Sequence, residues 1–256
     1  MKKLAFAMIS GLVLLSCGTN AAETGLVREF YACNFKEGKG MADLEGARDV
    51  LLEQVGKMGS KDLDDMISFV WTPFMGGADI DFLWFNMNAN LNAWGRATDV
   101  ANDSEHSAAV QAAFDEMSEC VNSGVAMAEV IYDGGGMNAS AITSSSGAAF
   151  VEAFNCSLRP GKTVADARAA VENWQTVIKD LGIYDSYIAY MMTPLIASGT
   201  TDVFYFAAHP DATSYAARQT AYLTSDAGVA ADAGFNEVHR CTASLWFGHP
   251  FISVEQ

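Results

Sequence analysis

Apolar residues recur with two different spacings in residues 27–132, and the changes of spacing predict a series of elements. Alternating apolar and polar residues are typical of a strand with one buried face, whereas apolar residues three or four apart are typical of a helix. The helix expected over residues 41–58 ends at Gly59. In order, the series is a strand at 27–35, a helix at 41–58, strands at 67–74 and 81–88, a helix at 91–119 that is interrupted near 102–104, and a strand at 121–132.

The same order returns in the second half of the chain. The letters GKGMAD at 38–43 are echoed by GKTVAD at 161–166, an offset of 123 residues, and further along an offset of 121 pairs Trp94 with Tyr215. The second series is a strand at 149–158, a helix at 164–181, strands at 187–196 and 202–209, a helix at 214–240 and a strand at 242–247. A unit of about 120 residues is the size of a small domain rather than of a solenoid repeat.

The duplication and the composition between its copies predict two domains. Residues 134–147 contain a run of three glycines and a run of three serines, which is typical of a flexible linker. We therefore expect a first repeat at 23–133 and a second repeat at 148–256.

The first 22 residues have the layout of a secretory signal. Two lysines near the start are followed by an apolar run that is too short to span a bilayer, and then by small and polar residues. Two cleavage positions stay open, an ordinary one near Ala21 and Ala22 and a lipoprotein one that leaves a lipidated Cys17. The predicted localisation is periplasmic or extracellular, with a membrane anchor in the second case.

The remaining four cysteines occupy equivalent places in the two repeats. An even number of cysteines in an exported chain indicates disulfides. The repeat favours one bridge inside each unit, Cys33 with Cys120 and Cys156 with Cys241, and four free thiols are the alternative. In a ferredoxin-like β-α-β-β-α-β unit the first and last strands are antiparallel neighbours, which brings the same pairs together.

The duplicated β-α-β-β-α-β order resembles the dimeric α+β barrel superfamily. The resemblance implies an α+β fold in which two tandem ferredoxin-like repeats pack sheet to sheet as an intramolecular barrel, because each sheet has an uncovered face to bury. The superfamily includes cofactor-free monooxygenases, muconolactone-isomerase-like enzymes and fused haem proteins such as chlorite dismutase and the dye-decolourising peroxidases. No signature motif of one member family is found, so the resemblance transfers no catalytic residue.

Strand alternation sorts the side chains into two faces. The uniformly apolar Leu83, Phe85 and Met87 are expected under the helices, so the alternate positions are expected to face the other sheet. A mixture of aromatic and polar groups is typical of a small-molecule pocket. The residues expected in the space between the sheets are Glu29, Tyr31, Trp84, Asn86, Asn88, Glu152, Tyr205 and His209.

Three of these residues are candidate catalytic groups. Glu29 and Glu152 recur at one repeat position, and a glutamate held in an apolar wall tends to have a raised pKa and can act as a general base. His209 stands where the first repeat has Asn88, which breaks the symmetry. The other five residues are candidate ligand-binding groups. The structural alternative is that each glutamate pairs with a buried arginine or lies at a wet barrel mouth.

The sequence predicts no cofactor, no metal site and no nucleic-acid partner. His106, His209, His239 and His249 are not spaced as metal ligands, and a haem would need one of the last three as its axial ligand. The formal net charge of −16 argues against nucleic acid and anionic lipid, which both need clustered cations.

Two functional hypotheses follow. In the first, an exported protein binds a small apolar or aromatic molecule between its sheets and turns it over as a cofactor-free monooxygenase or isomerase does. In the second, it is a non-enzymatic periplasmic or surface interaction module whose barrel is packed solid by Trp84 and Tyr205. A cavity of ligand size would separate the two hypotheses.

Overall fold

The computed structural model describes residues 25–63, 67–76, 79–103, 105–134, 147–182, 187–197 and 200–252. The predicted signal segment 1–22 with Cys17 and most of the predicted linker lie outside these ranges. The first repeat comprises β1 (Leu26–Phe35), α1 (Met41–Met58), a short 3₁₀ turn (Lys61–Leu63), β2 (Ile67–Met75), β3 (Phe82–Asn88), α2 (Leu91–Asp103), α3 (Ser107–Met117) and β4 (Ser118–Asp133). The second comprises β5 (Ala149–Leu158), α4 (Val164–Asp180), β6 (Ile188–Ala197), β7 (Val203–His209), α5 (Ala212–Leu223), α6 (Asp226–Val238) and β8 (His239–Ile252).

The predicted order of elements is confirmed, with two differences. The helix expected at 214–240 is two helices, because Ser225 begins a new one: its hydroxyl accepts a hydrogen bond from the backbone N–H of Gly228. The last strand of each repeat is longer than expected, because it pairs with strands of both repeats. β4 pairs with β1 and β6, and β8 pairs with β5 and β2.

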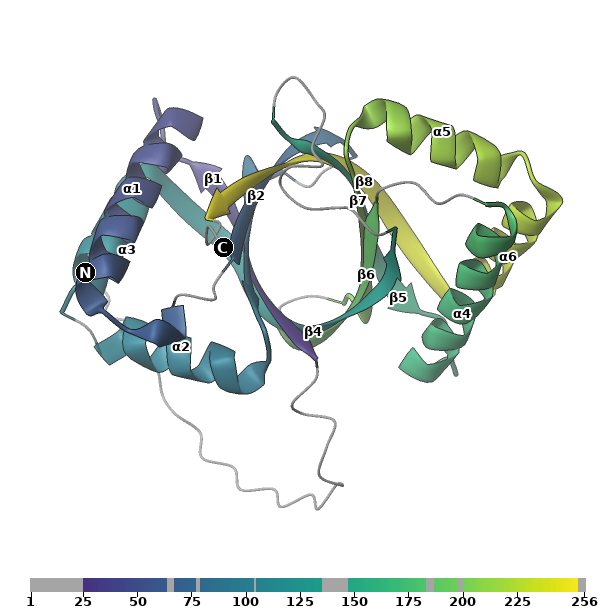
Figure 1. The fold of residues 1–256 in the computed structure, drawn as a ribbon, viewed down its shortest axis with the longest axis horizontal. Helices are drawn as coiled ribbons and strands as arrows, with labels where there is room; N and C mark the ends of the chain where they lie inside the picture. Colours follow the sequence, from purple (N-terminus) through teal and green to yellow (C-terminus); the bar gives the residue numbers. More distant parts are fainter. Residues whose placement is uncertain are drawn as a thin grey trace, which may run out of the picture.

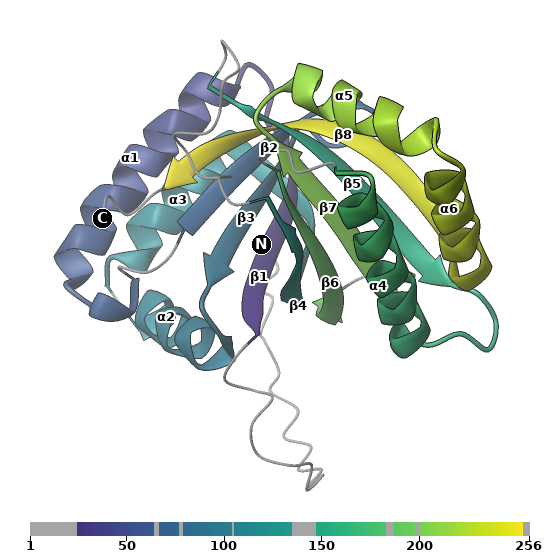
Figure 2. The same ribbon diagram turned by 45° about the vertical axis from the view of Figure 1, so that its right-hand side comes forward.

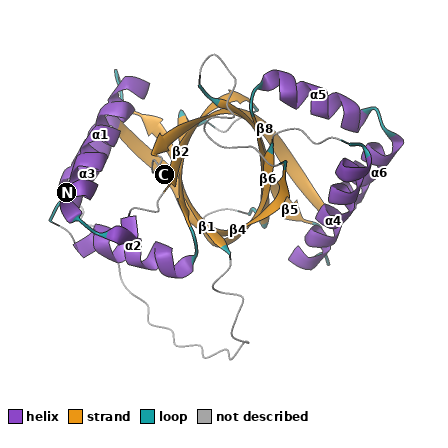
Figure 3. Ribbon diagram, in the orientation of Figure 1, coloured by secondary structure: helices purple, strands orange, loops and turns teal. Residues whose placement is uncertain are grey.

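These long strands close the two sheets into one barrel. Its strands follow the order β1-β3-β2-β8-β5-β7-β6-β4, with β4 paired back to β1, and every adjacent pair is antiparallel. Figure 1 shows the ring of strands, and Figure 2 shows it after a 45° turn. The helices lie in two groups on opposite sides of the ring, α1–α3 over the first repeat and α4–α6 over the second (Figure 3). None of the helices among the described residues has the length and apolar character that crossing a membrane requires.

The barrel lumen is filled by aromatic and aliphatic side chains from all eight strands. The ring of Trp71 lies 4.3 Å from that of Phe85 and 5.0 Å from that of Phe206, and the rings of Phe206 and Tyr190 are stacked 4.7 Å apart, centroid to centroid. Arg28 also lies inside, with its guanidinium 5.0 Å from the ring centroid of Tyr190, and burial lowers its pKa to about 10. The lumen is therefore a packed core rather than the predicted ligand space.

The prediction of which strand face points inward is wrong. Phe85 and Phe206 belong to the lumen cluster, whereas Trp84 and Tyr205 pack under the helices. Strands enclose the lumen on every side, so it receives the more apolar face of the strands, with Arg28 as a charged exception. The layer between sheet and helices has cavities and receives the mixed face.

Both predicted disulfides are present. Cys33 is the register partner of Cys120, and Cys156 is the register partner of Cys241, so each bridge joins two neighbouring antiparallel strands within one repeat. The bridged residues are 87 and 85 positions apart in sequence, so each bridge removes much conformational freedom from the unfolded chain.

Removing one bridge will destabilise the protein measurably. The double variant Cys33→Ala/Cys120→Ala is expected to lose about 2–5 kcal/mol of unfolding free energy, because it opens a long closed loop. Urea unfolding followed by circular dichroism measures the change. An unchanged urea midpoint would show that the bridge adds nothing to stability.

Candidate functional site

A cavity of about 1380 Å³ lies between the sheet of the first repeat and its helices, outside the barrel lumen. Its sheet side is formed by β1, β3 and β4, and its helix side by α1, α2 and α3. We call it the repeat-one cavity, and the lining residues used below are Glu29, Tyr31, Leu51, Met58, Trp84, Asn86, Asn88, Trp94, Ala97, Thr98, Ala101 and Phe114. The second hypothesis predicted a solidly packed barrel without a cavity of ligand size. The lumen is packed, although not by Trp84 and Tyr205, whereas a cavity of ligand size lies outside it.

The structure brings together five of the eight residues that were expected to line one pocket. Glu29, Tyr31, Trp84, Asn86 and Asn88 all line the repeat-one cavity. They face α1, α2 and α3 rather than the other sheet, because β1 and β3 turn their mixed face toward the helices. These five residues therefore line one cavity, as predicted, but this cavity lies under the helices and not between the two sheets.

A chain of polar contacts holds the carboxylate of Glu29. The Asn86 amide donates a hydrogen bond of 3.0 Å to one oxygen, and the Trp94 indole N–H approaches the other at 3.5 Å. The Ser68 hydroxyl donates in turn to the amide oxygen of Asn86 at 2.7 Å. Burial raises the pKa of Tyr31, and the nearby Glu29 adds to the rise. The site thus presents a neutral phenol beside a carboxylate that is fixed by neutral donors.

The second repeat has a smaller cavity, of about 480 Å³, in the equivalent place. Glu152 is buried here with three donors: the Arg218 guanidinium at 2.6 Å, the Gln219 amide at 2.6 Å and the Tyr215 hydroxyl at 3.2 Å. Burial raises the pKa of Glu152, and the Arg218 charge opposes the rise. For Glu152, therefore, the structural alternative of a pair with a buried arginine is confirmed.

Sequence reasoning did not single out the residues that make the two cavities differ. The offset of 121 that pairs Trp94 with Tyr215 also pairs Ala97 with Arg218, Thr98 with Gln219, and Ala101 with Tyr222. Asn90 and Asp211, paired by the same offset, each accept a hydrogen bond from the backbone N–H three residues on, so the offset holds in space. Small side chains in the first repeat thus leave open the space that large side chains occupy in the second.

His209 and Tyr205 lie apart from the repeat-one cavity. Tyr205 lines the smaller cavity, and its hydroxyl lies 3.1 Å from Nε2 of His239. His209 is completely buried, stacked on the ring of Tyr187 with the edge of Tyr215 nearby. Burial, together with the Arg218 charge, lowers the pKa of His209 to about 3, so its ring is neutral at physiological pH.

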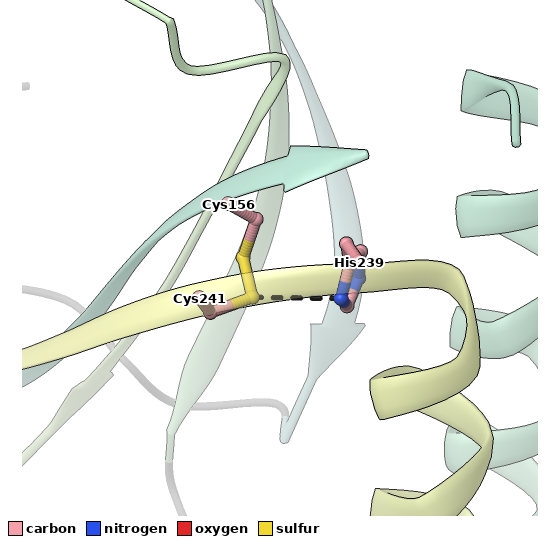
Figure 4. Close-up of side chains that lie close together, drawn as sticks. All are labelled: Cys156, His239 and Cys241. Carbon is pink, nitrogen blue, oxygen red and sulfur yellow. Dashed lines mark hydrogen bonds between the residues drawn. A yellow bond between two sulfur atoms is a disulfide. The ribbon is translucent and has the colours of Figure 1, made fainter. Parts of the chain in front are cut away.

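One cluster in the second repeat has the residue types of a metal site. Atoms of Cys156, His239 and Cys241 lie within 4.8 Å of one another, and Figure 4 shows the His239 ring beside the disulfide. The Nδ1 atom of His239 is 3.5 Å from Sγ of Cys241. The two sulfur atoms are bonded to each other, so neither is a thiolate that could bind a metal ion.

Comparison with known proteins identifies the architecture. No protein-family model matches the chain, and no curated protein matches it by sequence. A candidate monooxygenase from Fusobacterium nucleatum matches at a TM-score of 0.55 and 12% identity, over 88% of this chain and 93% of that one. A candidate chlorite dismutase (TM-score 0.52, 12% identity, 90% and 96% covered) and an anthrone oxidase-like protein (0.52, 12%, 91% and 95%) also match. These likenesses show the dimeric α+β barrel fold.

The same comparison overturns the expectation that the protein takes no cofactor. Chlorite dismutases, named above among the fused haem proteins of the superfamily, are neighbours of this chain. One from Candidatus Nitrospira defluvii matches at a TM-score of 0.51 and 10% identity, over 90% of this chain and 93% of that one. Haem is therefore a cofactor to be judged against the residues of this chain.

The volume of the repeat-one cavity, about 1380 Å³, does not exclude a haem, because it lies above the range of about 300–1,000 Å³ that is usual for ligand pockets. Cys33 and Cys120 line the cavity as a disulfide, so neither is a thiolate that could bind iron. The described lining holds two other side chains of types that bind haem iron elsewhere, the Met58 thioether and the Tyr31 phenol, and no histidine. The raised pKa of Tyr31 disfavours the phenolate form that binds iron. A haem bound here would take Met58 as its ligand rather than one of the histidines considered above.

The buried ion pair of the second repeat can be tested by removing its cation. Arg218→Met leaves the Glu152 carboxylate buried without its charge partner, and the expected loss of unfolding free energy is about 3–5 kcal/mol. The matched control is Arg168→Met, which breaks an exposed pair with Glu129 and should cost less than about 1 kcal/mol. Equal losses in the two variants would contradict the buried pair.

Acid should destabilise the fold through His209. The unfolded histidine binds a proton below about pH 6.5, whereas the folded one does so only near pH 3, so stability is lost as the pH falls through this window. The expected slope from this group approaches about 1.4 kcal/mol per pH unit. His209→Asn, which copies Asn88, should unfold with a shallower pH dependence between about pH 6 and 4.5 in urea titrations. Parallel profiles for the variant and the wild type would rule this out.

Proposed function

We propose that the protein binds a small, mostly apolar or aromatic molecule in the repeat-one cavity. The cavity itself carries the proposal, because it combines a volume of about 1380 Å³ with aromatic walls and a few fixed polar groups. The rings of Trp84 and Phe114 lie 4.4 Å apart, and those of Tyr31 and Trp84 lie 6.3 Å apart, so they form a continuous wall. Asn86 and Glu29 supply polar groups that can orient a ligand.

Glu29 is the candidate for proton transfer within this site. It is half-buried, whereas Asp115 and Glu119, the other acids of the described lining, are exposed. A carboxylate held by neutral donors can accept a proton from a bound molecule. The neighbours' names include a monooxygenase and an anthrone oxidase-like protein, so oxidation of an aromatic compound is the first reaction class to assay.

Export remains part of the proposal. It is supported by the signal-like residues 1–22 and by the two disulfides, since disulfides persist in oxidising compartments. The partner in this proposal is a small molecule, and a lipid on Cys17 would be the link to a membrane.

Narrowing the cavity beside Leu51 should weaken binding. Leu51 lines the repeat-one cavity where the second repeat has Trp174, so Leu51→Trp copies a side chain that the fold already accommodates. The neutral probe N-phenyl-1-naphthylamine should bind to Leu51→Trp at least about tenfold more weakly than to the wild type, as measured by calorimetric titration. The matched control is Leu52→Trp on the exposed side of α1, which should bind as the wild type does.

The wild-type protein should also be isolated from its own host and studied by native mass spectrometry. A discrete non-covalent mass that disappears on denaturation would identify the natural ligand class, haem included. Added haem, followed by its absorbance in the wild type and in Met58→Ala, tests the cofactor directly. Equal binding of the naphthylamine probe by Leu51→Trp and Leu52→Trp would place its site elsewhere and contradict the proposal.

A further inference from the structure

The second repeat contains a smaller version of the repeat-one cavity, because large side chains occupy part of the space. Glu152 there is engaged by a guanidinium: Nη2 of Arg218 lies 2.6 Å from its Oε2, and the side chains of the pair are 5% and 9% exposed. Gln219 and Tyr215 donate to the other oxygen, so both carboxylate oxygens have partners. In the second repeat, therefore, the surroundings of the glutamate include a cation, Arg218.

The first repeat keeps the glutamate but not the cation. Ala97 stands in the place of Arg218, and Thr98 in that of Gln219. The donors that remain for Glu29 are neutral. They are the Asn86 amide, the Trp94 indole and the Tyr31 hydroxyl. Among the described residues, no lysine, arginine or histidine forms an ion pair with Glu29.

The place that the arginine fills in the second repeat is open space in the first. The repeat-one cavity is lined by Ala97 and Thr98 as well as by Glu29. It therefore reaches the Glu29 carboxylate from the side on which a guanidinium would lie. Trp84 and Trp94 are among the residues that line this cavity, and the Trp94 indole N–H lies 3.5 Å from Glu29. Aromatic faces attract cations, and a carboxylate binds a planar cation through charge-assisted hydrogen bonds.

We infer that the ligand of the repeat-one cavity is an organic cation, an amine, amidine or guanidine on an aromatic or apolar body, whose charged group pairs with Glu29 where Arg218 pairs with Glu152. The inference rests on the proposed binding function and specifies its ligand class. Arg218, whose guanidinium lies 5.1 Å from the ring centroid of Tyr187, gives the approximate chemistry, a planar cation beside an aromatic ring. The net charge of −16 also draws cations toward the protein.

Two probes of the same shape and different charge test the inference. Naphthalene-2-carboxamidine is a cation at neutral pH, and naphthalene-2-carboxamide is its neutral counterpart. Calorimetric titration of the wild type should show that the amidine binds at least about tenfold more tightly. In Glu29→Gln the preference should fall to less than about twofold while the carboxamide binds as before. The control Glu53→Gln removes the same charge from an exposed pair with Lys57 and should keep the full preference.

A second variant adds the missing cation to the protein. Ala97→Arg puts a guanidinium where the second repeat has Arg218, so it should occupy Glu29 and weaken amidine binding at least about tenfold. Thermal unfolding confirms that each variant is folded.

The outcomes separate the inference from the function on which it rests. If the wild type binds the amidine and the carboxamide equally well, or if Glu29→Gln keeps the preference, the cavity binds small molecules but the cationic class is wrong. If neither probe binds and N-phenyl-1-naphthylamine does not bind either, the proposed function fails and the inference fails with it.

Discussion

Hydrogen bonding between the edges of two sheets is the interaction on which the rest of this structure depends. A ferredoxin-like sheet standing alone leaves edge strands with unpaired backbone groups, which promote association with other chains. Here β2 pairs with β8 and β4 pairs with β6, so the edges of one repeat satisfy those of the other. β4 and β8 are long enough to serve two partners each. The closed barrel then fixes which strand face is enclosed and which lies under helices.

Closure also explains why the cavities lie outside the barrel. The lumen is narrow and enclosed, and rings such as Trp71, Phe85 and Phe206 fill it. The helices cover the outer faces at a spacing that their own side chains determine. In the second repeat, Arg218, Gln219 and Tyr222 project into that layer and engage Glu152 or line its cavity. Their small counterparts in the first repeat leave the larger cavity, so the two repeats share one frame and differ in how far side chains fill the layer between sheet and helices.

Much of the fold could be predicted from the sequence, and part of the site. Helix α1 and strand β5 match their predicted ranges, because a glycine ends the helix and turn residues flank the strand. The division into α5 and α6 was missed, since the apolar pattern runs on through the serine cap. The glutamate shared by the repeats was identified from their alignment alone. Its surroundings were not, because a pattern of period two separates two faces without saying which one lies inside.

By itself, the sequence determined the duplicated order of elements, the pairing of the cysteines and the recurrence of one glutamate, because periodicity, register and repetition are local properties of the chain. Only the tertiary structure decided which face fills the lumen, how far β4 and β8 extend, and which repeat has the larger cavity. These features depend on side chains from distant elements meeting in space. The approach of Arg218 to Glu152, 66 positions away, is such a contact, and in the first repeat Ala97, which stands in the place of Arg218, lines the larger cavity together with Glu29.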